Sequence, residues 1–304
     1  MDYVLTTNNI SKQYRQFKAL DGLTMRVPKG AIYGFVGRNG AGKTTLIRLI
    51  CGLQSPTSGD YTLYSIDSRA KDIVQSRKRI GAVVETPSIY MDMTAEENLK
   101  LQYKVLGLQP NEGITELLKL VGLENTDRKK ARNFSLGMKQ RLGIAVALAG
   151  SPDFLILDEP TNGLDPQGII EMRELILKLN RELHITVLIS SHILDELSKV
   201  ATHYGFIDAG HIVKEMSAEE LEAACKKAMR VEVTNTQTLS RVLDEMSVSY
   251  EIHSDRQADI FAKLNVSELT IALAKENCEV ISLQEHEETL ESYFVNLIGG
   301  GKNA

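Results

Sequence analysis

The sequence predicts an α/β fold with a mixed sheet at its core, and two observations carry that prediction. Apolar, β-prone runs alternate with helical patterns, as in α/β proteins. The run 31–36 leads into a glycine-rich loop and then into the helix-like stretch 46–50. The run 154–157 is continuously apolar and ends in carboxylates, which is typical of a parallel strand buried on both faces. Acidic residues in that position lie where α/β folds place their chemistry.

The glycine-rich loop is the stretch around which the rest of the chain is organised. It fits the phosphate-binding pattern G-x-x-x-x-G-K-[ST], and its residues are Gly37, Arg38, Asn39, Gly40, Ala41, Gly42, Lys43, Thr44 and Thr45. Glycines let the backbone turn its N–H groups inward, and the helix start adds partial positive charge, so such a loop binds polyphosphate. We expect Lys43 to reach the β- and γ-phosphates and the Thr44 hydroxyl to bind Mg²⁺. A dinucleotide fold is excluded, because G-x-G-x-x-G from Gly40 would need glycine where Thr45 stands.

Carboxylates at the end of strand 154–158 form the second signal. In a protein with a phosphate-binding loop, we expect Asp158 to orient Mg²⁺ through water and Glu159 to polarise the attacking water. His192 follows the predicted strand 186–190 and is expected to contact the γ-phosphate. Tyr14 lies in a predicted loop at 13–17, where it is either a platform for a purine ring or a buried strand aromatic.

Composition limits the classes of function. The 304 residues are 43% hydrophobic and carry a net charge of −5, which is ordinary for a globular protein and argues against bulk electrostatic binding of nucleic acid. No signal peptide is visible, and no apolar run is long enough to span a bilayer. We therefore expect any transport role to require another subunit. Three scattered cysteines indicate a reducing compartment.

Taken in order, these features resemble the ATP-binding subunit of ABC transporters over about residues 1–215. The resemblance makes Tyr14 the adenine-stacking aromatic, 37–44 the Walker A motif, and 155–159 the Walker B motif with its catalytic carboxylate Glu159. It makes His192 the switch histidine. The region 94–149 is predicted to be mostly helical, beginning with a capping box of Thr94 and Glu97, and a helical subdomain is expected at about 88–150.

Two further motifs of the resemblance would contact nucleotide from a second copy. Ser135 and Gly137 lie where the signature helix begins, and Asp165 lies in the segment that resembles the D-loop. The usual L-S-G-G-Q reads Phe-Ser-Leu-Gly-Met over 134–138, but the kept Ser135 and Gly137 still offer a hydroxyl and a close backbone approach to a γ-phosphate.

A second departure is Glu85, which stands at the position of the Q-loop glutamine. A carboxylate there can still bind Mg²⁺, but it adds negative charge near the phosphates and a sensitivity to pH. The two departures together resemble the branch that handles bacitracin and lantibiotic-type peptides.

The resemblance implies an ATPase, with ATP and Mg²⁺ as cofactors, that powers export of a peptide antibiotic or similar amphiphile. Its partners would be a membrane-spanning permease and a second copy of the chain, or a related ATPase, closing on ATP; nucleic acid is not expected. The protein would be cytoplasmic and would sit on the inner face of the membrane through the permease. The alternatives are a soluble ABC-type ATPase that acts on ribosomes or DNA, and a nucleotide-gated regulatory protein.

The motifs end near residue 217, so we expect an ATP-binding domain over 1–216 and an accessory or regulatory domain over 217–304. The second domain is predicted to be a small α+β, ferredoxin-like unit with the order β-α-β-β-α-β. Its predicted strands are 230–234, 248–253, 258–262 and 279–284, and its helices are 236–246, 265–275 and, at the end, 287–297.

Overall fold

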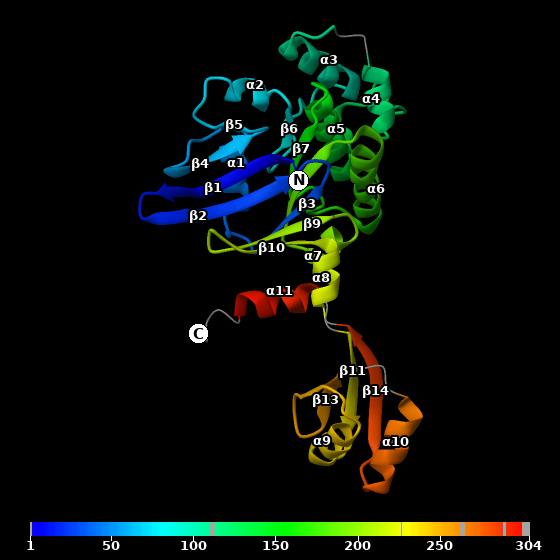
Figure 1. Ribbon diagram of the computed structural model, residues 1–304. Helices are drawn as coiled ribbons and strands as arrows, with labels where there is room; N and C mark the ends of the chain where they lie inside the picture. Colours follow the sequence, from blue (N-terminus) through cyan, green and yellow to red (C-terminus); the bar gives the residue numbers. More distant parts are fainter. Residues whose placement is uncertain (1, 110–112, 226, 262–264, 288–289, 300–304) are drawn as a thin grey trace. The chain divides into compact units, whose positions relative to one another are not determined.

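The chain forms two compact units, Met1–Ala218 and Glu219–Ala304, in the computed structural model. Residues 2–109, 113–225, 227–261, 265–287 and 290–299 are described (Figure 1). Over these residues, no helix has both the length and the apolar character needed to cross a bilayer. An accessory or regulatory role for the second unit remains a prediction.

The first unit contains two sheets. One is antiparallel in the order β2-β1-β4-β5, with β1 (Tyr3–Tyr14), β2 (Phe17–Pro28), β4 (Ser58–Leu63) and β5 (Ile66–Asp67). The other has the order β10-β9-β3-β8-β7-β6, with β3 (Ile32–Val36), β6 (Ile80–Val83), β7 (Phe154–Asp158), β8 (Thr186–Ser191), β9 (His203–Asp208) and β10 (His211–Ser217). Its strands are parallel except β10, which runs antiparallel to β9. The predicted mixed sheet is thus confirmed.

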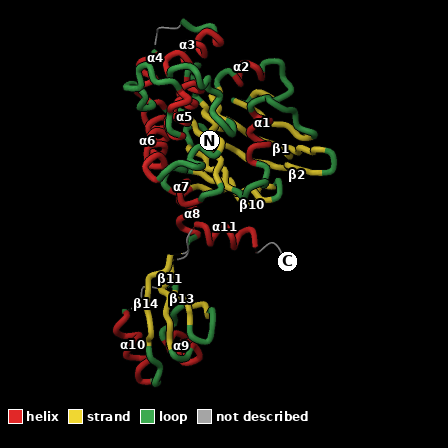
Figure 2. The backbone as a smooth tube through the Cα atoms, turned by 180° about the vertical axis from the view of Figure 1, so that it is seen from behind, coloured by secondary structure: helices red, strands yellow, loops and turns green. Residues whose placement is uncertain are grey.

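Helix α1 (Lys43–Ile50) is buried between the two sheets. Its Leu46 and Ile50 pack in one core with Leu23 of the antiparallel sheet and with Phe35 and Phe154 of the mixed sheet. The helices α5 (Leu136–Leu148) and α6 (Pro166–Leu183) lie on the opposite side of the mixed sheet (Figures 1 and 2). The phosphate-binding loop therefore starts a helix that the surrounding core holds rigidly in place.

The region 94–149 after β6 is mostly helical, as predicted. It contains α3 (Ala95–Leu106) and α4 (Ile114–Leu120) before α5, and the capping box of Thr94 and Glu97 at the start of α3 is confirmed. Between α4 and α5 the chain is irregular, apart from the short 3-10 helix Ala131–Asn133. Gly122, with φ of 66°, follows the end of α4, and the Ala131 N–H bonds to the Met93 carbonyl at 2.8 Å. This hydrogen bond holds the segment beside the start of α3.

The loop predicted over 13–17 is shorter in the structure, because strand residues reach Tyr14 on one side and Phe17 on the other. The strands β1 and β2 continue into a tight hairpin in which Tyr14 pairs with Phe17. Arg15 adopts φ of 55°, the left-handed conformation that such short turns require. The strand propensity of the residues does not show where this hairpin turns, because the residues at its tip, Arg15 and Gln16, are polar.

The second unit is an antiparallel sheet in the order β12-β13-β11-β14. After α8 (Ala218–Ala224), its elements are β11 (Lys227–Val233), α9 (Thr236–Glu245), β12 (Tyr250–Ile252), β13 (Gln257–Ile260), α10 (Val266–Lys275), β14 (Val280–Glu287) and α11 (Leu290–Gly299). From β11 onward their ends lie within three residues of the predicted ones, while the predicted positions 262, 288 and 289 lie outside the described ranges. Leu243 of α9 and Leu273 of α10 share a core with Val231 of β11. The likeness to a ferredoxin-like fold remains a prediction.

A partly buried ion pair joins two strands of this unit. Arg230 of β11 lies opposite Asp259 of β13, and its Nε and a terminal nitrogen donate to the two carboxylate oxygens at 2.7 Å each. His253 Nε2 lies 2.8 Å from Asp259 Oδ2. The hydrogen bonds from the Arg230 guanidinium, and secondarily the one from His253, lower the pKa of Asp259 from 3.8 to about 2.

We expect Asp259→Asn to lower the free energy of unfolding at pH 7 by about 2 kcal/mol, because each pKa unit corresponds to about 1.4 kcal/mol. The folded pKa is depressed, so this stabilisation is complete above about pH 4 and is lost as the pH falls towards 2. Urea unfolding of the full chain from pH 7 to pH 2 measures this. The gap between wild type and Asp259→Asn should close over that window, and Asp255→Asn, at an exposed site nearby, should show no gap.

Candidate active site

The phosphate-binding loop connects β3 to α1 in a backbone conformation that only glycine allows. Gly40 and Gly42 have φ of 81° and 113°. A Cβ added at Gly37 would lie 2.5 Å from the Ile207 carbonyl oxygen, and one at Gly42 would lie 2.5 Å from the carbonyl oxygen of Ala19. At the tip of the loop Arg38, Asn39 and Gly40 are exposed, whereas Ala41 is buried and Thr45 is half-buried.

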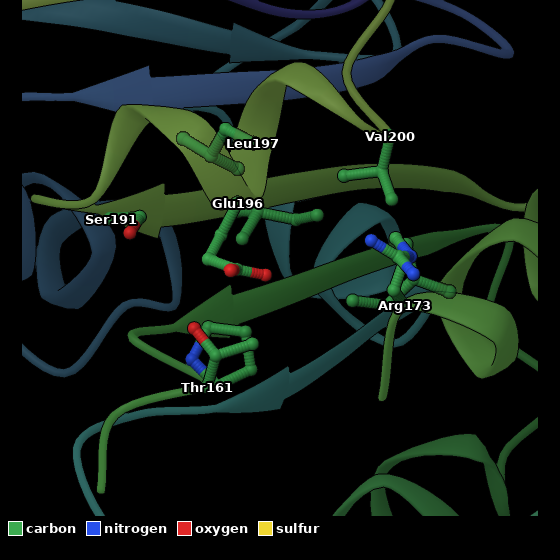
Figure 3. A pocket seen from close by; sticks show the side chains of 9 residues that line it. Thr161, Arg173, Ser191, Glu196, Leu197 and Val200 are labelled. Atoms are coloured by element: carbon green, nitrogen blue, oxygen red, sulfur yellow. The ribbon is translucent and has the colours of Figure 1, made fainter. Parts of the chain in front are cut away.

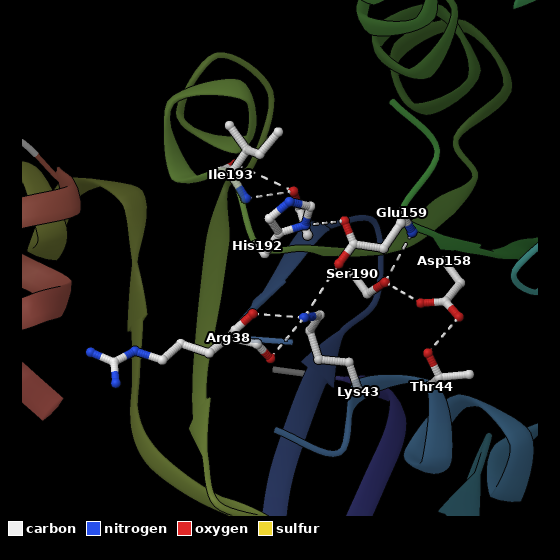
Figure 4. A network of polar contacts seen from close by, with 10 residues as sticks. Arg38, Lys43, Thr44, Asp158, Glu159, Ser190, His192 and Ile193 are labelled. Carbon is white, nitrogen blue, oxygen red and sulfur yellow. Dashed lines mark hydrogen bonds and ion pairs between the residues drawn. The ribbon is translucent and has the colours of Figure 1, made fainter. Parts of the chain in front are cut away.

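Lys43 is the buried charge at the centre of this loop. Its side chain is 6% exposed, and Nζ donates to the carbonyl oxygens of Gly37 at 2.6 Å and Arg38 at 3.3 Å. Nζ also lies 3.3 Å from Glu159 Oε1 (Figure 4). The loop thus brings together Lys43 and the predicted catalytic carboxylate, which are far apart in the sequence.

Asp158 ends β7 beside the start of α1. Its Oδ2 accepts a hydrogen bond from Thr44 Oγ1 at 2.8 Å, and its Oδ1 accepts one from the Ser190 hydroxyl (Figure 4). Asp158 is 3% exposed, and within the described part of the chain no cation lies at ion-pair distance from it. A buried carboxylate needs a compensating charge, so this pair of oxygen donors suits a divalent cation.

The magnesium ion of a nucleotide complex fits this donor set. In the described ranges, no group of three or more His, Cys, Asp or Glu side chains is placed to hold a metal by itself. Mg²⁺ is usually held by one or two carboxylates together with phosphates and waters. Thr44 and Asp158 are therefore the residues that would hold it.

Glu159 lies just beyond β7 in the left-handed conformation, with φ of 50°. Its backbone N–H bonds to the Ser190 hydroxyl oxygen at 3.0 Å, which fixes the turn. His192 Nδ1 donates to Glu159 Oε2 at 2.8 Å, while Oε1 faces Lys43. A base oriented by a histidine at the edge of a phosphate-binding loop is equipped to polarise water next to a phosphoryl group.

Ser190 is the residue of this network whose role the sequence did not predict. It is the last residue but one of β8, and the parallel register places it directly opposite Asp158. Its hydroxyl bonds to both Asp158 and the Glu159 backbone (Figure 4). The available signal was a pair of serines closing an otherwise apolar strand.

The hydrogen bond and ion pair described for Glu85 go to Arg48 and do not reach Thr44 or Asp158. Glu85 follows β6 with φ of 60°, and its carboxylate accepts a hydrogen bond from an Arg48 guanidinium nitrogen at 2.6 Å. Tyr14 is 37% exposed, and its hydroxyl donates to Gln54 Oε1. The Lys12 ammonium lies 5.2 Å from the centre of the Tyr14 ring.

The signature and D-loop residues lie at the starts of their own helices. Ser135 caps α5 by accepting a hydrogen bond from the Met138 N–H at 3.2 Å, and Asp165 caps α6 by accepting one from Gly168 at 3.2 Å. A Cβ on Gly137 would be 3.7 Å from Leu164, so the two helix starts adjoin. None of the hydrogen bonds described for Ser135, Gly137 or Asp165 reaches the phosphate-binding loop. Their role with nucleotide remains a prediction.

A small pocket lies behind the loop that follows Glu159 (Figure 3). It is lined by residues of that loop, β8, α6 and α7 (Leu194–Ser198), which include Thr161, Arg173, Ser191 and Glu196. Its volume of about 20 Å³ is close to the room that one water molecule needs. A nucleotide therefore cannot enter there, and the open edge of the phosphate-binding loop is the candidate site.

The fold and this edge define a phosphate-loop nucleotide-binding protein of the α/β class. The family model described as ABC transporter matches residues 20–162. The bacitracin transport ATP-binding protein of Bacillus licheniformis is 42% identical over 305 residues, which cover 99% of each chain. This chain belongs to the family of ABC transporter ATP-binding proteins, and it is an ATP-binding ATPase.

Three further matches cover 70–73% of this chain. The lantibiotic transport ATP-binding protein of Streptococcus pyogenes is 43% identical over 212 residues, covering 70% of this chain and 90% of the relative. A solved part of an ABC transporter complex of Clostridium perfringens is 29% identical with a TM-score of 0.66, covering 73% of this chain and 92% of that one. A dimeric bacterial ABC transporter cassette has a TM-score of 0.64 at 26% identity, covering 70% and 98%.

We expect Ser190→Ala to weaken ATP binding in the presence of Mg²⁺ several-fold, because the Asp158 carboxylate loses the hydroxyl that orients it. The unsatisfied buried acceptor should also lower the free energy of unfolding by about 1–3 kcal/mol. Calorimetric titration and urea unfolding measure the two effects. Ser191→Ala is the control, since the hydrogen bonds described for that hydroxyl stay within its own turn, at Ile193. Equal loss of ATP affinity in both variants would contradict the assigned role.

Proposed function

We propose that this chain is the ATP-hydrolysing subunit of an exporter for a peptide antibiotic or similar amphiphile, and that it serves self-protection. The observation that carries the substrate class is the full-length match to a bacitracin transport ATP-binding protein, which includes the second unit. The lantibiotic transport relative supports the same class over 70% of this chain. The signature variant at 134–138 and Glu85 are the departures from the family pattern that indicate the same branch.

In the proposed reaction, Lys43 binds the β- and γ-phosphates, and Glu159 polarises the attacking water. His192 keeps the Glu159 carboxylate oriented through the hydrogen bond from its Nδ1. Thr44 and Asp158 would hold Mg²⁺, which when bound neutralises charge on the phosphate oxygens. Since Lys43 contacts Glu159 at 3.3 Å, a phosphate that recruits the Lys43 ammonium would release the carboxylate for its work on water.

Two copies are proposed to close on ATP, each offering its signature helix to the nucleotide of the other. The start of α5, capped by Ser135, would supply backbone N–H groups and the helix dipole to the partner's γ-phosphate. Leu136 of α5 is 45% exposed, which suits a surface that is covered on association. Closure is favoured because the γ-phosphate contacts exist only in the closed state.

The permease is proposed to bind in a groove between the segment after β6 and the helices α3 and α5. The groove is lined by Thr86, Ser88, Gln102, Leu106 and Val146, among others, and it adjoins Glu85. Exposed apolar side chains lie at its border, with Val105 72% and Leu108 42% exposed. A partly open groove of mixed polar and apolar lining suits an amphipathic partner helix. The chain would thereby be held at the inner face of the membrane and, in line with its charge of −5, would not bind nucleic acid.

We expect Glu159→Gln to reduce ATP hydrolysis at least a hundred-fold, as for loss of a general base, and to retain ATP in a stable dimer. Size-exclusion chromatography with and without ATP tests this. Lys43→Ala is the control, which should bind no ATP and remain monomeric. A Glu159→Gln chain that holds ATP yet stays monomeric would refute the closed dimer. A wild-type chain that binds ATP without hydrolysing it, alone or with its permease, would favour the nucleotide-gated regulator.

We expect Leu106→Asp to reduce recovery of the chain with its permease from solubilised membranes several-fold, because a charge enters the groove. ATP affinity of the isolated chain should not change. Leu53→Asp is the matched control, since Leu53 is 65% exposed and does not line the groove. Equal recovery of the two variants would place the permease contact elsewhere.

A further inference from the structure

The Glu85 carboxylate is paired with a cation that comes from the helix of the phosphate-binding loop. Arg48 lies on α1 four residues after Thr44, one helical turn further along. Its guanidinium donates to Glu85 Oε1 at 2.6 Å. The left-handed backbone of Glu85, with φ of 60°, turns the chain at the point where this pair forms. The contact joins the end of β6 directly to α1.

This ion pair matters because carboxylates crowd the edge of the sheet where a polyphosphate would bind. The parallel register pairs Val83 of β6 with Leu157 of β7, so Glu85 follows its strand at the same level as Glu159 follows the next. Glu159 is paired with Lys43, and Glu85 is paired with Arg48. Among the described residues, Arg48 is the cation at ion-pair distance from Glu85, so without Arg48 the charge of Glu85 beside α1 would be uncompensated.

We propose that Arg48 is a positioning residue of the nucleotide site, which holds the Glu85 carboxylate and compensates the charge that glutamate brings to this position. The proposal rests on ATP binding at the phosphate-binding loop. It explains how this chain tolerates a carboxylate where the family resemblance expects an amide. The side chains of Arg48 and Glu85 are 35% and 56% exposed, so solvent screens the pair and its effect is a few-fold.

The test is a double-mutant cycle on the full chain, with ATP and Mg²⁺ as the probe and the dissociation constant from calorimetry as the readout. Arg48→Gln is expected to weaken binding three- to ten-fold. In the Glu85→Gln background the same substitution should change affinity less than two-fold, because no charge then needs compensation. Raising the salt concentration should shrink the Arg48→Gln defect, since salt screens exposed charges.

Arg48→Lys keeps the charge, and it should keep affinity within about three-fold of wild type, which controls for damage to α1. Equal weakening by Arg48→Gln in both backgrounds would overturn the inference, because Arg48 would then act on the nucleotide or on the helix and not through Glu85. An unchanged affinity in Arg48→Gln would overturn it as well. A wild-type chain without affinity for ATP would instead overturn the proposed function on which the inference rests.

Discussion

The contact between Lys43 and Glu159 is the interaction on which the rest of the site depends. It requires a loop whose backbone passes so close to Ile207 and Ala19 that side chains at Gly37 and Gly42 would collide. It also requires a core that holds α1 between two sheets. Because Lys43 is buried and donates to two carbonyl oxygens, its position is set by the loop itself. A polyphosphate and Glu159 would compete for the same ammonium group, which links binding to activation of the carboxylate.

The parts of the site that the sequence predicted are those that one motif contains, or that the ends of parallel strands bring together. The loop over 37–45 is local, so its geometry follows from glycine spacing and from the helix start. Asp158 and His192 could be placed because the carboxyl ends of parallel strands meet at one edge of a sheet. The sheet itself was predictable from continuous apolar runs such as 154–157.

The contacts that the sequence could not predict depend on register between distant strands or on how elements pack. Ser190 reaches Asp158 only because β7 and β8 pair at those residues. The Arg48–Glu85 pair depends on where α1 lies relative to β6, which no local pattern reports. Ser135 and Asp165 differ from these residues, because the helix caps that they form are local. Their proposed ligand would be bound to another chain.

The charges around the loop form one pattern that joins these observations. Asp158 and Glu159 stand at the end of β7, and Glu85 follows the neighbouring strand β6; α1 supplies cations to two of these three carboxylates, Lys43 to Glu159 and Arg48 to Glu85. Asp158 is the most buried of the three, and within the described chain it is satisfied by the hydroxyls of Thr44 and Ser190. The edge is therefore short of one positive charge at the place where oxygen donors converge. A nucleotide that arrives with its own divalent cation supplies that charge, whereas a bare polyphosphate would add repulsion at the same point.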